Sequence, residues 1–447
     1  MKNSLFKVRP LPFTMESKTD ILIIGAGLAG MSAAARLRGK CRVRIVEKED
    51  RPGGLVVTDE VKGFRFDRTG HLLHLRDPSI RKWILGLMGG TMTVVHRMSR
   101  IFSNGVYTRY PFQSNTFGLP PQAARECLEG YLKVWRNPPR LKIRSFMDFI
   151  NVHFGEGFAK HFMVPYNRKI WGVHPRDMTA DWCARFVPVP RLEDVLAGAV
   201  GLHDRELGYN KKFYYPRLGI GRLSEALARS VGRHTEIELG KAVASIDHCR
   251  RTATLKSGEK IHYKHIISSM PLKALGRCIE NPPAAAAEAF SLLRCNPLRY
   301  LDVALKTRPG TPYHWSYVPS TGIPFYRVGA YSNFSPALVP RGCGSLYVEL
   351  ASRGPIAMTR LMPSVSKNLV AMGIIRRASD IKFAIPKSID YAYVVYDHDH
   401  SRATAAIARF LEKNGVFSIG RYGGWNYSAM EDALIMGRET ALKIIGR

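Results

Sequence analysis

The segment Asp20–Gly30, DILIIGAGLAG, is the part of this sequence that most constrains its fold. Its four branched apolar residues, Ile21–Ile24, predict a buried strand of a parallel sheet. The spacing of Gly25, Gly27 and Gly30 predicts a tight turn from that strand into a helix. The first glycine permits the turn, the second lets a phosphate approach the backbone, and the third lets the helix lie close to the sheet.

The residues around this turn complete a dinucleotide-binding pattern. The amide groups of Leu28 and Ala29 begin the helix and are expected to point at a pyrophosphate. A second strand, Val43–Val46, ends at Glu47, whose carboxylate can accept hydrogen bonds from ribose hydroxyls, and Lys48 follows as a further candidate contact. The sequence therefore predicts a Rossmann-like α/β domain that binds a dinucleotide.

The composition limits the class of protein. At 447 residues and 45% hydrophobic, the chain can form a large core in more than one domain. No apolar run reaches the roughly 18 residues of a membrane-spanning helix. Residues 1–17 lack the apolar core of a signal peptide and are expected to form a flexible extension. Seven scattered cysteines without C-x-x-C pairs favour a reducing cytoplasm, with neither a disulfide framework nor a metal site.

The formal net charge of +31 favours an anionic partner. Nucleic acid is the least favoured class, because the basic residues are spread along the chain and no nucleic-acid-binding module is present. A solvated basic surface and an anionic small-molecule substrate stay equally open, followed by peripheral contact with an anionic membrane. The sequence does not indicate an oligomeric state.

The order of predicted elements divides the chain into three parts. Strand–helix alternation assigns residues 18–75, 215–285 and 410–447 to one discontinuous nucleotide-binding domain. Helical periodicity predominates over 76–214, which is predicted to be a helical insertion. Alternating aromatic and branched residues over 286–409 predict an antiparallel sheet that forms a substrate domain.

The segment Arg51–Gly54, RPGG, lies just beyond the ribose-binding acid. It resembles the R-x-G-G signature of a group of flavoproteins that includes amine oxidases, phytoene desaturases, protoporphyrinogen oxidase and UDP-galactopyranose mutase. The resemblance implies that the dinucleotide is FAD, and that Gly53 and Gly54 also approach it.

Two further segments resemble the flavin-binding parts of UDP-galactopyranose mutase. Residues 69–74, TGHLLH, resemble the mutases' GPHIFHT, whose histidine pair lies against the flavin ring. His74 is the favoured catalytic residue and His71 a cofactor contact. Residues 420–432, GRYGGWNYSAMED, resemble GRLATYKYYDMDQ. That resemblance implies flavin contacts from Gly420 and Met430, a diphosphate contact from Arg421, and a role near the phosphates for Tyr427.

Other segments resemble the substrate cleft of the mutases. Residues 166–171, YNRKIW, resemble YTxKxW, so the resemblance implies that Tyr166 and Trp171 line the cleft. Residues 323–328, IPFYRV, resemble VPYTRI, whose arginine corresponds to Arg327 and reaches the flavin and the substrate phosphates. The remaining candidates for contact with a diphosphate are Arg185, Arg191, Tyr393 and Tyr396.

The resemblance implies an enzyme that isomerises a nucleotide-diphosphate sugar between pyranose and furanose forms, through an adduct at N5 of reduced FAD. The mutases place a sugar-facing aspartate where this chain has Ala429, and the tract after Arg185 differs in pattern. Two other functions therefore stay open. One is an oxidoreductase of the amine oxidase or protoporphyrinogen oxidase type, and the other is a non-catalytic flavin-binding protein.

Overall fold

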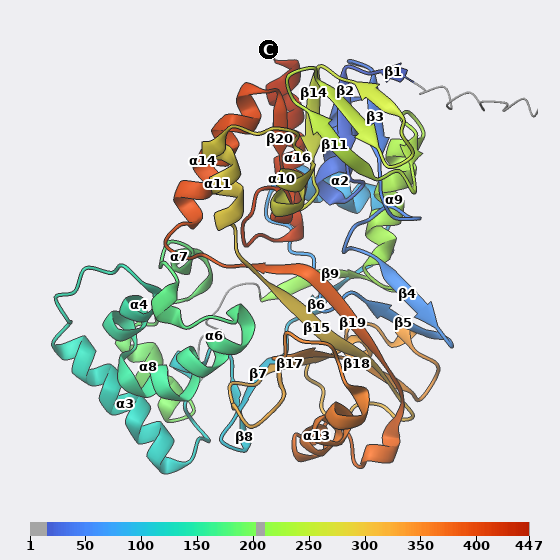
Figure 1. The fold of residues 1–447 in the computed structure, drawn as a ribbon. Coiled ribbons are helices and arrows are strands. Elements are labelled where there is room, and N and C mark those ends of the chain that lie inside the picture. The colour runs from blue at the N-terminus through green and yellow to red at the C-terminus, as the bar shows by residue number, and fades with distance from the viewer. Residues whose placement is uncertain (1–15, 203–210, 447) are drawn as a thin grey trace, which may run out of the picture.

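The computed structural model describes residues 16–202 and 211–446. Figure 1 shows a nucleotide-binding domain at the top, a broad sheet below it and a helical lobe at the lower left. The predicted extension 1–17 lies outside the described residues except for Glu16 and Ser17, which begin β1 (Glu16–Lys18). The predicted mixed α/β fold, with a Rossmann-like domain and a sheet domain, is confirmed.

A five-stranded parallel sheet forms the centre of the nucleotide-binding domain. Its order is β10-β3-β2-β14-β20, and its strands come from three distant parts of the chain. Every residue of the Ile-rich strand β2 is buried, as expected for a parallel strand that is covered on both faces. The five strands are β2 (Ile21–Ile24), β3 (Val43–Val46), β10 (Ile237–Glu238), β14 (His265–Ser268) and β20 (Val416–Ser418).

A four-stranded sheet of order β1-β13-β12-β11 lies beside the parallel sheet, and the structure has two further short antiparallel pairs. The strands of the four-stranded sheet are β11 (Val243–Asp247), β12 (Thr252–Leu255) and β13 (Lys260–His262), with β1. The two pairs are β4 (Thr58–Val61) with β5 (Phe64–Asp67), and β6 (Met92–His96) with β9 (Lys212–Pro216).

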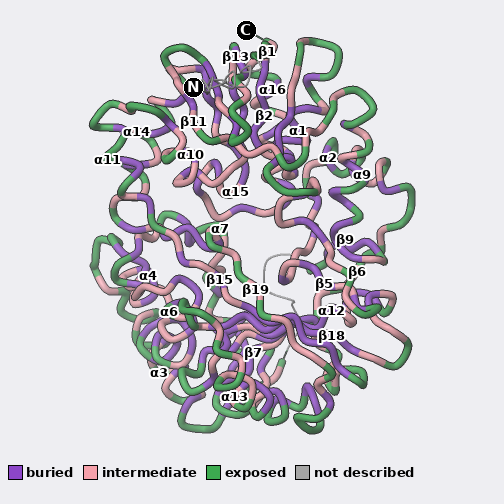
Figure 2. Tube along the Cα trace, turned by 45° about the vertical axis from the view of Figure 1, so that its right-hand side comes forward, coloured by how far each residue is buried: buried purple, intermediate pink, exposed green. Residues whose placement is uncertain are grey.

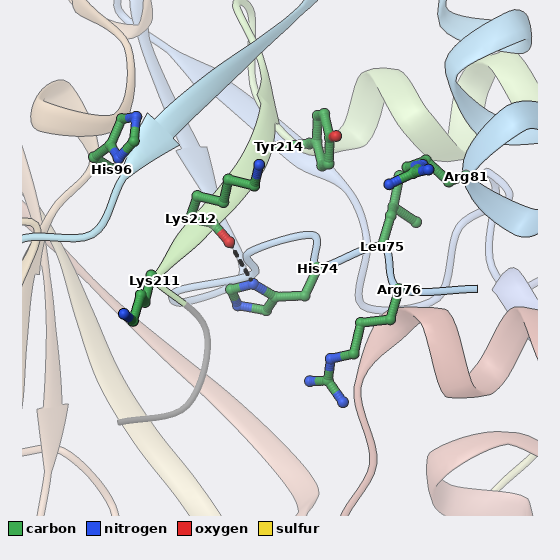
Figure 3. Close-up of a pocket in the computed structure, with 8 residues that line it drawn as sticks. All are labelled: His74, Leu75, Arg76, Arg81, His96, Lys211, Lys212 and Tyr214. Carbon is green, nitrogen blue, oxygen red and sulfur yellow. Dashed lines mark hydrogen bonds between the residues drawn. The ribbon is translucent and has the colours of Figure 1, made fainter. Parts of the chain in front are cut away.

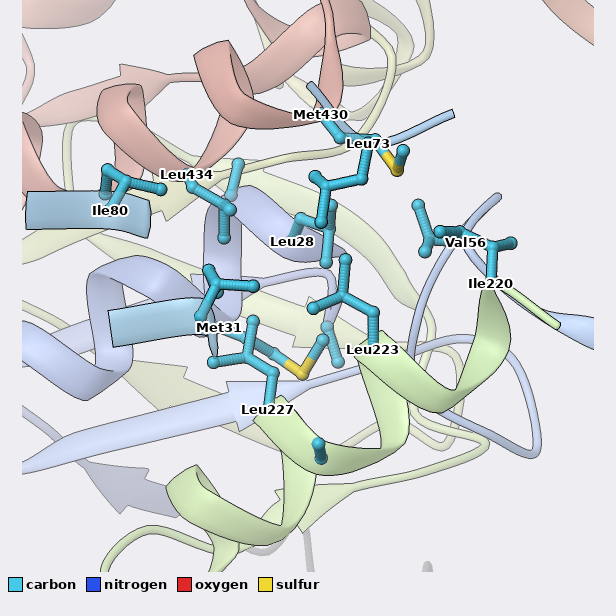
Figure 4. Close-up of a cluster of buried hydrophobic side chains, with 14 of the residues drawn as sticks. Leu28, Met31, Val56, Leu73, Ile80, Ile220, Leu223, Leu227, Met430 and Leu434 are labelled. Atoms are coloured by element: carbon cyan, nitrogen blue, oxygen red, sulfur yellow. The ribbon is translucent and has the colours of Figure 1, made fainter. Parts of the chain in front are cut away.

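Four helices pack together on one side of the parallel sheet, as Figure 4 shows. They are α1 (Leu28–Leu37), α2 (Pro78–Met88), α9 (Gly221–Gly232) and α16 (Met430–Ile445). Helices α1 and α16 are in backbone contact, since a Cβ on Gly437 would lie 2.2 Å from the carbonyl oxygen of Ala29. The Ser32 hydroxyl donates a hydrogen bond to the Leu434 carbonyl at 2.6 Å. The last helix of the chain is thereby attached to the first.

A seven-stranded sheet of order β19-β15-β18-β17-β16-β7-β8 forms the second domain. Its pairs are antiparallel except β16 with β7. Figure 2 shows that much of it is buried. Strands β6, β7 and β8 fall within residues 76–214 and β9 begins there, so that stretch is not helical throughout. The seven strands are β7 (Ser99–Ser103), β8 (Val106–Arg109), β15 (Cys295–Leu305), β16 (Trp315–Tyr317), β17 (Phe325–Ala330), β18 (Gly344–Leu350) and β19 (Ile381–Val394).

The helical lobe has an aromatic core that includes Phe112, Phe146 and Phe158, all fully buried. It consists of α3 (Pro121–Arg136), α4 (Phe146–His153), α5 (Gly155–Phe158), α6 (Val164–Trp171), α7 (Cys183–Phe186) and α8 (Leu192–Ala199). The other helices are α10 (Leu272–Cys278), α11 (Ala284–Leu292), α12 (Tyr331–Phe334), α13 (Met358–Ala371), α14 (His400–Lys413) and α15 (Gly420–Gly423). None of the described helices combines the length and the apolar character needed to cross a bilayer.

The hydroxyl of Tyr331 connects the two domains. It donates to the carbonyl of Asp67 at 2.6 Å and accepts from the amide of Thr69 at 3.1 Å. It also lies 3.1 Å from the carboxyl of Asp302 on β15. Burial raises the pKa of Asp302 to about 8 and that of Asp67 to about 6. A protonated Asp302 can donate to the Tyr331 hydroxyl, which completes a hydrogen-bond chain from the seven-stranded sheet to the nucleotide-binding domain.

The raised pKa of Asp302 predicts a pH-dependent stability. The folded protein holds this proton more tightly than the unfolded chain does, so the resulting stability is present at low pH and is lost as pH rises through about 8. Between pH 7 and 8 the free energy of unfolding falls by about 1 kcal/mol. We expect the thermal midpoint of the holoprotein to fall from pH 7 to 9, and Asp302→Asn to flatten that fall. An equal slope in both proteins would contradict the assignment.

Candidate active site

The turn between β2 and α1 forms a cradle that side chains would block. A Cβ on Gly30 would lie 2.1 Å from the carbonyl oxygen of Gly25. Gly25 itself has a φ of +100°, and a Cβ there would lie 2.4 Å from Oγ of Ser269. Helix α1 begins without a side-chain cap and without an acidic residue in its first turn. Its first amide groups therefore have no competing side chain and are available to bind an anion.

The carboxylate of Glu47 closes one end of this cradle. It is 5% exposed, and it accepts hydrogen bonds from the amide of Ala26 at 2.7 Å and from that of Glu49 at 3.0 Å. Each carboxylate oxygen keeps a further lone pair, which suits a ribose diol. Lys48 points to solvent, with 71% of its side chain exposed, and pairs with Glu49 at 3.1 Å.

The glycine pair Gly53-Gly54 lies against the turn between β2 and α1. The Gly53 amide donates to the Ala26 carbonyl at 2.8 Å, and a Cβ on Gly54 would lie 3.6 Å from Cα of Gly27. On the other side, a Cβ on Gly420 would lie 3.0 Å from Cβ of Ala29. Backbone therefore surrounds the start of α1, and these residues fit the pyrophosphate and ribose of FAD.

The segment that carries the two histidines is pressed against the seven-stranded sheet. Thr69 has a φ of 67°, and a Cβ on Gly70 would lie 2.5 Å from the Tyr347 hydroxyl. In His71, Nδ1 is buried and has no hydrogen-bond partner within residues 16–202 and 211–446. Burial, together with the charge of Arg421, lowers the pKa of His71 to about 4. A neutral His71 can therefore offer Nδ1 to a bound ring.

His74, the favoured catalytic residue, faces a different space. Its Nδ1 lies 3.0 Å from the Lys212 carbonyl oxygen, and burial lowers its pKa to about 4. As Figure 3 shows, it borders a cavity of about 500 Å³ whose charged lining is basic. The lining residues are His74, Leu75, Arg76, Arg81, His96, Lys211, Lys212 and Tyr214. The structure thus brings His71, rather than His74, near Arg421.

Arg327 forms a buried ion pair that the sequence did not indicate. Glu349 stands opposite it on β18, with no exposure, and the two side chains join through two hydrogen bonds of 2.9 and 2.5 Å. Arg327 keeps 19% of its side chain exposed and also donates to the Tyr393 hydroxyl at 3.2 Å. Its charge is therefore largely compensated within the protein.

Arg421 has a different environment. It donates to the Ser428 carbonyl at 2.7 Å, and its guanidinium lies 4.5 Å from the ring centre of Tyr427 and 6.0 Å from that of Tyr393. Across the described parts of the chain, it forms no ion pair with a carboxylate. A guanidinium held by backbone carbonyls, here those of Ser428 and Ala392, and by aromatic faces keeps its full positive charge for a ligand.

Two side chains of the helical lobe, Trp171 and Tyr166, complete an aromatic cluster around Arg327 and Arg421. The other rings of this cluster are Tyr317, Tyr393 and Tyr427. Trp171 is 2% exposed, and its ring centre lies 5.7 Å from that of Tyr393 and 5.5 Å from that of Tyr427. Tyr166 is also buried and packs edge-on against Tyr317 at 5.5 Å. The Tyr396 hydroxyl accepts from the Tyr427 amide at 2.7 Å. Trp171 and Tyr166 are therefore buried among the other rings, whereas Tyr427 and Tyr317 are half-buried.

The two remaining predicted arginines, unlike Arg421, form ion pairs with carboxylates. Arg185 bonds both carboxylate oxygens of Asp432, at 2.8 and 2.9 Å, at the start of α16. Arg191 is exposed and pairs with Asp194 at 3.2 Å. The acid between Asp432 and Met430, Glu431, is buried and accepts from the amides of Arg76 and Asp77. Both acids that follow Ala429 are thus already engaged.

Sequence reasoning missed three residues in or next to the cluster: Glu349, Tyr110 and Tyr317. Glu349 is the one acid in the otherwise uncharged strand β18, GSLYVEL, and such a buried carboxylate requires a cationic partner. That signal could have found it. Tyr110 lies 5.3 Å from Tyr317 and carries the Arg97 guanidinium 4.9 Å above its ring. No local pattern marks these two tyrosines.

The glycine cradle predicts loss of flavin in Gly30→Ala. The added Cβ would displace the Gly25 carbonyl and open the pyrophosphate turn, so the variant should purify with little FAD. Gly86→Ala is the matched control, since Gly86 lies in α2 with no atom within 4 Å of an added Cβ. The ratio of flavin to protein absorbance measures the result, and equal ratios in the two variants would contradict the cradle.

The buried pair predicts a non-additive effect on stability. Glu349→Gln should lower the free energy of unfolding by about 3 kcal/mol, because it leaves the Arg327 guanidinium buried without a counter-charge. The double variant Arg327→Met with Glu349→Leu removes both charges and should recover most of that loss. Urea midpoints of the holoproteins measure both changes. A double variant no more stable than Glu349→Gln would show that packing, rather than charge, dominates.

Comparison with known proteins supports the cofactor site. The sequence pattern of flavin containing amine oxidoreductases matches residues 28–336, more than half of the chain. A phytoene dehydrogenase from Streptomyces griseus is 45% identical over 66 residues, which cover 14% of this chain and only 13% of the dehydrogenase.

Solved structures match the whole fold. The chain is similar to a crystal structure of reduced UDP-galactopyranose mutase with a TM-score of 0.88 at 25% identity, over 96% of this chain and 94% of the mutase. Cyclohexylamine oxidase from Brevibacterium oxydans IH-35A matches with a TM-score of 0.68 at 16% identity, over 96% and 99% of the two chains. Putrescine oxidase bound to putrescine matches with a TM-score of 0.66 at 17% identity, over 97% and 100%. With these matches and the glycine cradle, the predicted FAD is confirmed, and the chain belongs to the family of flavin containing amine oxidoreductases.

Proposed function

We propose that this protein is an FAD-dependent mutase that isomerises the sugar ring of a nucleotide-diphosphate sugar. The observation that carries the proposal is the uncompensated guanidinium of Arg421 inside an aromatic cluster. The similarity to UDP-galactopyranose mutase along the whole chain also supports it.

The charge of the cluster favours an anionic substrate over an amine. Arg327 is compensated by Glu349, so Arg421 leaves the cluster with a net positive charge. The basic cavity beside His74 adds further positive potential on one side. A protonated amine such as putrescine would be repelled there, whereas a diphosphate would be attracted and could accept two parallel hydrogen bonds from Arg421.

The residues of the chain have separate roles in this proposal. Arg421 binds and orients the diphosphate, and the half-buried Tyr427 and Tyr317 contact the nucleoside or the sugar. Trp171 and Tyr166 hold those rings in place. Neutral His71 offers Nδ1 to the flavin. It can act there as a hydrogen-bond donor or acceptor, according to the redox state of the flavin. Bound FAD, in its reduced form, supplies the nucleophile of the isomerisation.

The test uses the reduced holoprotein and a panel of UDP-, dTDP- and GDP-hexoses. We expect at least one member to perturb the absorbance of the reduced flavin and to give an isomer by chromatography, with no net oxidation. Arg421→Met should weaken that binding by at least 100-fold, the equivalent of about 3 kcal/mol for a lost charged hydrogen-bond pair. Arg402→Met is the matched control, because Arg402 lies on the surface and pairs with Asp399.

A second candidate is an oxidoreductase, favoured by the similarity in fold to the two amine oxidases. Steady peroxide formation or acceptor reduction with an amine, polyene or porphyrin, without response to any nucleotide sugar, would support it against the mutase. Retained flavin with no response to any of these compounds would instead indicate a non-catalytic flavin-binding protein. If Arg421→Met and Arg402→Met bound the nucleotide sugar equally well, Arg421 would not be part of the substrate site.

A further inference from the structure

The end of α3 and the loop after it carry an unusual surface, which we call the basic rim and define as residues 132–144, LKVWRNPPRLKIR. All but Val134 and Pro139 are exposed. The apolar side chains exposed here are large: Trp135 at 55%, Leu141 at 56%, Leu132 at 40% and Ile143 at 38%. Figure 1 shows α3 on the outer side of the helical lobe, away from the parallel sheet.

The apolar residues of the basic rim do not belong to the core of the lobe. Helix α3 turns Cys127 and Tyr131 inward, and Tyr131 is only 4% exposed. The next helix starts at a complete capping box, in which Ser145 and Asp148 bond each other's backbone amides. The loop is thus fixed at both ends by internal contacts, and its large apolar side chains stay outside.

The charge of the basic rim has a single sign. Lys133, Arg136, Arg140, Lys142 and Arg144 provide five positive charges within thirteen residues, and the segment has no Asp or Glu. The neighbouring acid Asp148 is already bonded to the amides of Arg144 and Ser145. Cations and apolar side chains alternate along the exposed loop, so side chains of both types are accessible to a partner.

We propose that the basic rim docks the protein on a bilayer that contains anionic lipid. Lysine and arginine are attracted to an anionic leaflet, each strengthening binding about fivefold, and tryptophan prefers the interface between headgroups and acyl chains. Leu141 and Ile143 gain by entering that interface, since it removes their apolar surface from water. Nucleic acid or an acidic protein would satisfy the cations but leave these apolar side chains without a matching environment.

Aromatic contacts link the end of the basic rim to the candidate active site. The core of the lobe connects the two, because Phe146, one residue after the capping Ser145, packs against Trp182 at 4.9 Å. Trp182 in turn packs against Trp171 at 5.0 Å. The inference goes beyond the proposed function and does not depend on the reaction.

The experiment is co-sedimentation of the full-length holoprotein with vesicles. Phosphatidylcholine vesicles are compared with vesicles of phosphatidylcholine and phosphatidylglycerol, at low and high salt. We expect binding to the anionic vesicles only, weakened by salt as surface charges are screened. Brominated lipid should quench tryptophan fluorescence, and the quenching should be lost in Trp135→Phe while binding is retained in part.

Two triple variants separate the basic rim from the net charge. Arg140→Gln with Lys142→Gln and Arg144→Gln should weaken vesicle binding by about 100-fold, from about fivefold for each charge. The control replaces Arg42, Arg250 and Arg402 by Gln, which removes the same total charge from exposed sites elsewhere. Flavin content and circular dichroism check that both variants are folded.

Three results would overturn the proposal. Equal loss of binding in the two triple variants would show that vesicle binding depends on the overall charge of the protein and not on the basic rim. Binding to anionic vesicles without quenching at Trp135 would exclude insertion of the rim. Tight binding to heparin or nucleic acid, with no binding to anionic vesicles, would assign the surface to an anionic polymer instead.

Discussion

The contacts of helix α1 at backbone distance are the constraint on which the rest of the structure depends. Gly30 lets α1 touch the Gly25 carbonyl of its own turn, and Gly437 lets α16 touch the Ala29 carbonyl. No side chain lies between these backbones, so their spacing cannot relax. The pyrophosphate turn, the R-x-G-G loop and the end of the chain are therefore held in one fixed arrangement around the cofactor site.

A second constraint is that only one of two arginines in the site has its charge compensated by a carboxylate. The protein compensates Arg327 with Glu349 but leaves Arg421 between backbone carbonyls and aromatic rings. His71 stays neutral beside Arg421, since burial and that charge both oppose its protonation. A site that keeps one positive charge and removes the others is suited to an anion, which is why charge is the strongest guide to the substrate class.

Much of the fold could be predicted from local patterns. The strands Ile21–Ile24 and Val43–Val46 lie where branched apolar residues place them. Strands β7 and β8 were missed in a stretch that reads as helical. A local signal was present, because Asn104-Gly105, both with positive φ, joins the two strands in a two-residue hairpin turn. Only the place of this hairpin in the sheet depends on the parallel pairing of β7 with β16, more than 200 residues later in the chain.

For the site, the sequence alone determined the dinucleotide turn, because glycine is needed at Gly25 for its positive φ and at Gly30 for its contacts with Ile23 and Gly25, and both requirements arise within eleven residues. Only the tertiary structure decided which histidine lies beside Arg421 and which arginine is compensated. Those outcomes depend on Tyr347, Glu349 and Asp432, which approach from other strands and helices, and no spacing along the chain encodes such distances. Charge compensation is a property of the packed molecule, since it depends on which carboxylates burial brings within reach of each cation.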